Sequence, residues 1–188
     1  MNIHLDCIPC FLRQALEAVR RTTGDTEAHE RMLRDVLAMT AEMDLAECPP
    51  MVGQRIHRRL RELTGNPDPY AEIKAQFNRA ALDMLPELAA RVEAAHDPLL
   101  AAAQLAIAGN IIDLGPNGQF TEEEARRVML DLAAQPVAGD LEPFREAVNA
   151  AGNILYLADN AGEIVFDRPL ITQLDPKRVT VAVRGAPT

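Results

Sequence analysis

The fold class follows from residues 153–163, NILYLADNAGE, together with residues 179–183, VTVAV. Each contains a short apolar run with the composition of a strand, and a segment of helical length separates the two runs. A strand, a helix and a second strand in this order predict a parallel pair joined by a crossover helix. Because parallel sheets are normally buried on both faces, the end of the chain is predicted to belong to an α/β domain.

The preceding part of the chain is predicted to be helical. Apolar residues recur there at spacings of three and four, which is typical of amphipathic helices. Pro86 is expected to kink or break one of these helices, and the almost uncharged helix near residues 99–108 is expected to lie centrally. We place a helical domain at residues 1–150 and the α/β segment at 151–188. Helices are expected at residues 11–19, 32–39, 51–63, 71–92, 99–108, 122–134 and 144–152.

Composition argues against several classes of partner. The 19 Lys and Arg residues against 28 Asp and Glu residues give a net charge of -9, which disfavours nucleic-acid binding. The sequence contains no run of 18 apolar residues, so no membrane span is predicted. The first residues do not resemble a secretion signal. With an odd set of three cysteines, reduced thiols and a cytoplasmic location are expected.

The polar stretch directly after the first predicted strand is the main candidate site. Open parallel sheets bind ligands beyond the carboxyl ends of their strands. Asp159 and Asn160 offer the hard oxygen atoms that magnesium and manganese prefer. Gly162 would let the backbone approach an anion, and the first amides of the following helix could face a phosphate. The alternative is an Asx turn that merely caps this helix.

Two other stretches are expected to face the same site. Arg184 and Gly185 follow the second strand, where a right-handed crossover would place Arg184 beside Asp159 as a phosphate ligand. An ordinary surface turn is the alternative. Asn110 and Asp113 end the uncharged helix, where polar groups need partners. Here the alternative is a C-terminal cap formed by residues 109–110.

The cysteines near the N-terminus admit a redox or metal interpretation. Cys7 and Cys10 begin a predicted helix, a position at which thiols can be reactive or bind a metal. A structural zinc site would also need Cys48 and a histidine, His4 or His57, to complete four ligands. The pattern favours the simpler interpretation of packed or lightly exposed thiols. Motifs of serine hydrolases, P-loop NTPases and zincins are absent from the sequence.

Five blocks of sequence, in order, resemble the metal-dependent damage-control phosphatases. This family was long labelled a domain of unknown function and was once linked to methyl transfer onto acidic residues. The paired cysteines resemble its prokaryotic subgroup. The blocks are residues 6–10 (DCIPC), residues 68–70 (DPY) with Lys74 and Asn78, residues 109–113 (GNIID), residues 159–163 (DNAGE) and residues 183–187 (VRGAP).

The resemblance implies a multi-helical N-terminal domain and a three-layer, Rossmann-like α/β domain that hydrolyses phosphomonoesters. The implied substrate is a small phosphorylated metabolite, such as a sugar phosphate or a related damaged metabolite. The implied cofactor is a divalent metal, Mn, Mg, Co or Ni, held by Asp159 and Asn160. Glu163 would be the catalytic acid or base. The implied substrate-binding residues are Asn110, Asp113, Gly162, Arg184 and Gly185.

The family pattern also contains an Asp a few residues beyond the Arg-Gly-x-Pro block, whereas this sequence ends at Thr188. We therefore expect a truncated chain with impaired activity and self-association through an exposed sheet edge. A carboxylate methyltransferase is one alternative, since an acidic residue after a strand can bind a ribose, although no glycine-rich turn precedes Asp159. The other alternative is a non-catalytic helical module for interaction or metal sensing.

Overall fold

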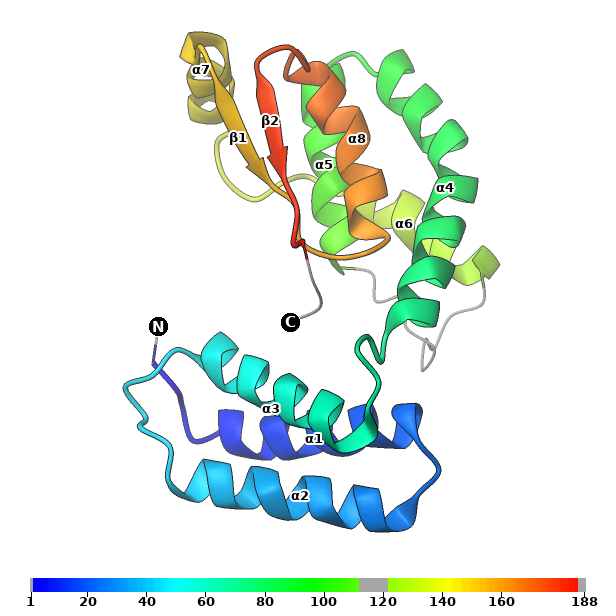
Figure 1. The fold of residues 1–188 in the computed structure, drawn as a ribbon. Coiled ribbons are helices and arrows are strands. Elements are labelled where there is room, and N and C mark those ends of the chain that lie inside the picture. Colours follow the sequence, from blue (N-terminus) through cyan, green and yellow to red (C-terminus); the bar gives the residue numbers. More distant parts are fainter. Residues whose placement is uncertain (1, 112–121, 186–188) are drawn as a thin grey trace. The chain divides into compact units, whose positions relative to one another are not determined.

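Three helices form a bundle at the start of the chain. The computed structural model describes residues 2–111 and 122–185, which divide into two compact units, 2–70 and Ala71–Gly185. The first unit contains α1 (Cys7–Thr22), α2 (Thr26–Ala41) and α3 (Pro49–Thr64) (Figure 1). Apolar side chains at helical spacing from all three helices form its core, among them Val19, Met32 and Ile56.

The ends of these helices follow from local sequence. The Asp25 carboxylate accepts the backbone N–H of Glu27 at 2.9 Å and so caps α2. Proline is tolerated in the first turn of a helix, which is where Pro49 lies in α3. Gly65 ends α3 in the left-handed conformation, with φ 66°.

The second unit contains five helices and two strands in the described part of the chain. The strands are parallel, with Ile154 opposite Val179 and Leu157 opposite Ala182, which confirms the predicted α/β class. In chain order the elements are α4 (Ala71–Ala94), α5 (Pro98–Ile111), α6 (Glu122–Ala133), α7 (Glu142–Ala150), β1 (Ile154–Leu157), α8 (Glu163–Gln173) and β2 (Val179–Ala182).

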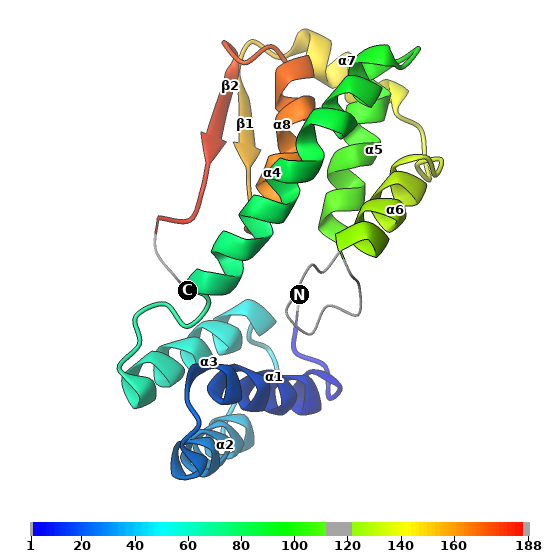
Figure 2. The ribbon, with the colours of Figure 1, turned by 90° about the vertical axis from the view of Figure 1, so that its right-hand side faces the viewer.

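Helix α5 is central in this unit, as its composition predicts. It packs against α4, α6 and α8, and these helices lie on one side of the sheet (Figures 1 and 2). Leu105 of α5, Met129 of α6 and Phe166 of α8 are fully buried in the shared core. Leu155 and Leu157 of β1 are 64% and 72% exposed, so the opposite face of the strand is open within the described residues.

Two features differ from the sequence-based expectations. Pro86 neither breaks nor ends α4, because buried residues before and after it, including Met84 and Leu88, hold both halves against one core. The compact units divide after Tyr70, whereas we expected a domain boundary at residue 150. Helices α4 and α5 pack against the crossover helix α8 and therefore belong to the unit that contains the sheet.

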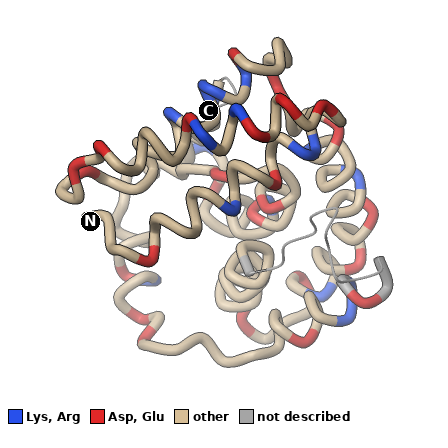
Figure 3. The backbone as a smooth tube through the Cα atoms, turned by 90° about the horizontal axis from the view of Figure 1, so that it is seen from below, with Lys and Arg blue, Asp and Glu red and all other residues tan. Residues whose placement is uncertain are grey.

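Charged residues are interspersed along the helices. Figure 3 shows acidic and basic positions following one another along the backbone. Several form ion pairs one helical turn apart, such as Glu30 with Arg34 at 2.6 Å. No helix in residues 2–111 or 122–185 is both long enough and apolar enough to cross a membrane.

Candidate active site

The ends of the two parallel strands bring Asp159 and Arg184 together. The pairing continues just past β1, where the Ala158 N–H donates to the Ala182 carbonyl at 3.0 Å. The next residues leave the sheet side by side, and Arg184 Nη2 donates to Asp159 Oδ1 at 2.6 Å. Arg184 therefore lies beside the candidate site, as predicted, and each of the two side chains is about half exposed.

A second set of hydrogen bonds connects this turn to α5 and α8. Asn160 Nδ2 donates to Glu163 Oε2 at 2.9 Å and lies 3.3 Å from Asp159 Oδ2. Asn110 Nδ2 donates to the other Glu163 oxygen, Oε1, at 2.5 Å. Asn110 lies inside α5, which continues to Ile111, so the alternative of a helix cap formed by residues 109–110 is wrong. The predicted proximity of Asn110 to the post-strand turn is confirmed.

Gly162 is held between this turn and helix α4. It has φ 81°, a conformation that favours glycine, and a Cβ atom there would lie 3.1 Å from the Phe77 Cβ atom. Its N–H donates to the Asn78 side-chain oxygen at 2.7 Å. Asn78 thus fixes the backbone of the turn from a position 84 residues earlier in the chain.

The start of α8 offers fewer free amides to an anion than we expected. The Gly162 N–H is bound to Asn78, the Ile164 N–H donates to the Asn160 carbonyl at 3.3 Å, and the Val165 N–H donates to the Gly162 carbonyl at 3.1 Å. A role for Gly162 in binding would therefore depend on its lack of a side chain rather than on its N–H group.

A buried carboxyl group, that of Asp167, lies in α8 one helical turn after Glu163 in the sequence. Asp167 is 5% exposed and accepts a hydrogen bond from the Tyr156 hydroxyl of β1. Burial raises the pKa of Asp167, and the negative charge of Glu163 raises it further. Burial and the same hydrogen bond also raise the pKa of Tyr156. This pair was not predicted from the sequence, although Asp167 follows the apolar residues 164–166, IVF, and such a position is a signal of a buried acid.

Of the remaining predicted site residues that the structure describes, Gly185 makes no contact with this network. Asp113 lies outside the described residues. Gly185 is exposed, with nothing within 4 Å of the position a Cβ atom would take. Cys7 and Cys10 are free, half-buried thiols. Within residues 2–111 and 122–185, no group of three or more His, Cys, Asp or Glu side chains is arranged to hold a metal ion.

The donor set of the turn is nevertheless compatible with a hard divalent cation. Asp159 and Glu163 supply carboxylate oxygens, and Asn160 uses its amide nitrogen in both bonds above, which leaves its amide oxygen outside them. Oxygen ligands of these types suit magnesium and manganese. With Arg184, the two carboxylates leave one formal negative charge at the site, a balance that favours a cation.

Comparison with known proteins identifies the family. Residues 3–188 match the domain described as the damage-control phosphatase ARMT1-like domain. The chain belongs to this family, as its sequence blocks predict.

The chain is 34% identical over 193 residues to a protein of Archaeoglobus fulgidus named damage-control phosphatase. It is 28% identical over 177 residues to a damage-control phosphatase of Pyrococcus horikoshii. The first alignment covers 100% of this chain and 66% of the relative, and the second covers 93% and 60%. The chain thus spans less than two thirds of the length of these curated relatives.

A crystal structure shares the fold. The chain superimposes on a DUF89 family protein of Pyrococcus horikoshii with a TM-score of 0.80 and 25% sequence identity. The match covers 100% of this chain and 66% of that one.

Proposed function

We propose that this protein is a divalent-metal-dependent phosphatase that hydrolyses phosphomonoesters of small metabolites such as sugar phosphates. The observation that carries the proposal is the hydrogen-bonded cluster of Asp159, Asn160, Glu163 and Arg184 beyond the ends of two parallel strands. Membership of a family whose curated relatives are named damage-control phosphatases supports it.

In this proposal Asp159 and Asn160 hold the metal, as their oxygen donors allow. Mn²⁺, Mg²⁺, Co²⁺ and Ni²⁺ are the candidates, and the bound ion supplies Lewis-acid polarisation of a phosphoryl oxygen. The hydrogen bond from Asn160 to Glu163 connects a proposed metal ligand to the proposed proton-transfer group. This bond would hold the two side chains in a fixed position relative to each other.

Arg184 is proposed to bind the phosphate group. Its guanidinium group binds one carboxylate oxygen of Asp159 through Nη2. Guanidinium groups also bind phosphate oxygens, often with two parallel N–H donors. A phosphomonoester would therefore compete with Asp159 for Arg184. The half-exposed position of this pair leaves it accessible to a small substrate.

Glu163 is proposed to transfer the proton during hydrolysis. As water attacks phosphorus and the ester P–O bond breaks, the Glu163 carboxylate accepts a proton from the water, and the departing alcohol oxygen then takes that proton. Asn110 holds one oxygen of this carboxylate at 2.5 Å and thereby fixes the direction in which the other oxygen points. Such orientation of a general acid or base is a recognised part of its effect on rate.

Hydrolysis of p-nitrophenyl phosphate by the 188-residue chain tests the proposal. Rates would be measured with each of the four metal ions and with EDTA, for the wild type, Asp159→Asn and Asp83→Asn. Asp83 is an exposed aspartate on α4 and serves as a matched control. We expect metal-dependent hydrolysis that Asp159→Asn lowers by about 100-fold or more, while Asp83→Asn leaves it unchanged. Equal rates for the two variants, or hydrolysis unaffected by EDTA, would overturn the proposal.

A further inference from the structure

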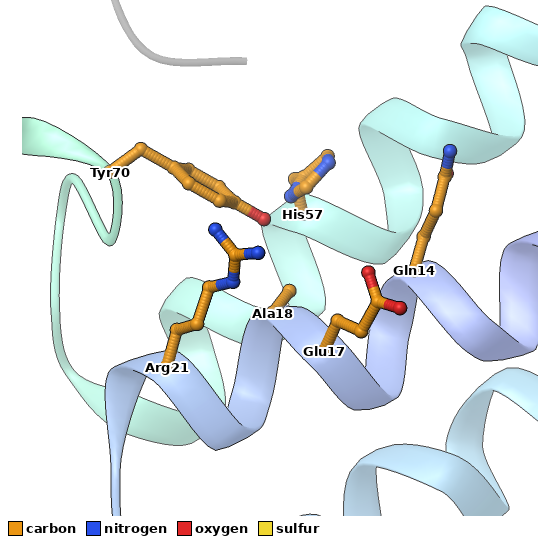
Figure 4. A pocket seen from close by; sticks show the side chains of 6 residues that line it. All are labelled: Gln14, Glu17, Ala18, Arg21, His57 and Tyr70. Carbon is orange, nitrogen blue, oxygen red and sulfur yellow. The ribbon is translucent and has the colours of Figure 1, made fainter. Parts of the chain in front are cut away.

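The helical bundle of residues 2–70 contains a pocket that the proposed phosphatase site does not use. Its volume is about 310 Å³, close to the lower size of pockets that bind small ligands. Side chains from α1 and α3 line it, together with Tyr70 (Figure 4). The lining residues are Gln14, Glu17, Ala18, Arg21, His57 and Tyr70.

Two side chains of opposite charge on α1, Glu17 and Arg21, line this pocket. Glu17 and Arg21 are four residues apart, with the Glu first, which is the favoured arrangement for an ion pair on a helix. Two other pairs in this chain with the same residues, spacing and order do form: Glu30 with Arg34 at 2.6 Å, and Glu87 with Arg91 at 3.0 Å.

No ion pair joins Glu17 to Arg21 in the described structure. Figure 4 shows the Arg21 guanidinium group turned toward the Tyr70 hydroxyl and the Glu17 carboxylate turned toward Gln14, both on the pocket side of α1. Both residues are exposed, so a solute can reach them. The separation leaves one positive and one negative group available at the edge of the same pocket.

The rest of the lining gives the pocket a floor and a partly apolar wall. Ala18 is 3% exposed, and its small side chain leaves the floor open. The Tyr70 ring meets His57 edge to face, with ring centroids 5.5 Å apart, which holds the aromatic wall in place. The Tyr70 hydroxyl is protonated at neutral pH, as is usual for tyrosine, and can donate a hydrogen bond. Burial raises the pKa of this hydroxyl further.

We propose that this pocket binds a small zwitterion, with an ammonium group at Glu17 and a carboxylate or phosphate group at Arg21. A ligand with only a negative group would meet repulsion from Glu17, and a ligand with only a positive group would meet repulsion from Arg21. A compact apolar portion would pack over Ala18 against the Tyr70 ring. Every lining residue belongs to the helical bundle, so the inference does not depend on the proposed phosphatase function.

Binding would be measured by calorimetry and by NMR titration of the full chain. L-leucine is the carboxylate-bearing zwitterion and phosphoethanolamine the phosphate-bearing one, so their comparison distinguishes the two anionic groups. 4-Methylpentanoate and 3-methylbutylamine each lack one charge of leucine. We expect saturable binding of at least one zwitterion, with single-charge analogues weaker by about tenfold or more.

Neighbouring arginines of α1 provide a matched pair of variants. Arg21→Ala and Glu17→Gln should each weaken zwitterion binding by about tenfold or more, whereas Arg20→Ala, an equal loss of charge on the same helix outside the pocket, should not. Thermal unfolding would verify that each variant is folded. The proposal is overturned if neither zwitterion binds, if an analogue with one charge binds as tightly, or if Arg20→Ala and Arg21→Ala weaken binding equally.

Discussion

Gly162 constrains the backbone of the candidate site. Its positive φ of 81° and the 3.1 Å approach of a Cβ atom to Phe77 both oppose any side chain at this position. Gly162→Ala is expected to lower the free energy of unfolding by about 1–3 kcal/mol, measured by urea denaturation.

Gly152→Ala is the control for this prediction. Gly152 lies just before β1, with nothing within 4 Å of its Cβ position, and the same substitution there should change stability by less than about 0.5 kcal/mol. Equal stability changes in the two variants would show that the turn tolerates a side chain.

Asp167 makes a pH-dependent contribution to stability. Burial raises its pKa in the folded state, so the folded protein retains a proton at pH values where the unfolded chain, with a pKa of about 3.9, has lost it. The stabilisation is therefore fully present below about pH 3.9 and is lost as the pH rises through the raised pKa. Asp167→Asn keeps an acceptor for Tyr156 without the charge.

The unfolding free energy of Asp167→Asn, relative to the wild type, should therefore increase between pH 4 and pH 7. Urea denaturation at several pH values measures this difference, with Asp83→Asn as an exposed control that should show a flat profile. A constant or falling difference for Asp167→Asn would contradict the assigned direction.

At the scale of elements, the contact between α5 and α8 positions the Asn110 side chain. The helices approach so closely at Gly109 that a Cβ atom there would lie 2.9 Å from the Phe166 Cβ and Cδ2 atoms. Gly109→Ala should destabilise the protein by about 1–3 kcal/mol because Phe166 is fully buried and cannot move freely. Thermal unfolding provides the measurement.

Gly53→Ala tests whether this effect comes from the helix contact. Gly53 lies inside α3 with nothing within 4 Å of its Cβ position, so alanine there should raise stability by about 0.5–1 kcal/mol through helix propensity. If Gly109→Ala were stabilising as well, the close approach of α5 and α8 would not restrict residue 109.

The ends of the two parallel strands place Arg184 beside Asp159. Under the proposed function, Arg184→Ala should raise KM for p-nitrophenyl phosphate by about tenfold or more while lowering kcat less, because it removes a ligand of the phosphate group. Arg168→Ala, an exposed arginine on α8, is the control. A selective fall in kcat with unchanged KM would argue against phosphate binding by Arg184.

Sequence patterns predicted the elements and part of the candidate site. Strand composition predicted β1 and β2, and the rule that ligands bind beyond strand ends singled out Asp159 and Asn160. The bond between Asn78 and Gly162 could not be predicted from spacing, because it joins residues 84 positions apart through the packing of α4 against α8. The close contact of Gly109 with Phe166 depends on tertiary packing in the same way.

The whole molecule divides into two compact units, which carry different candidate sites. Unit Ala71–Gly185 carries the oxygen donors and Arg184 at the ends of its sheet, whereas the helical bundle carries the pocket with Glu17 and Arg21. The proposed divalent-cation site, at Asp159 and Asn160 in the turn after β1, belongs to the first of these units.

Titration of the 188-residue chain with Mn²⁺, followed by electron paramagnetic resonance of the free ion, tests for this cation site without any substrate. We expect one bound Mn²⁺ per chain for the wild type and for Asp83→Asn, and an affinity lowered by about tenfold or more for Asp159→Asn. Absence of binding by the wild type, or equal affinity of Asp159→Asn and the wild type, would contradict the proposed site.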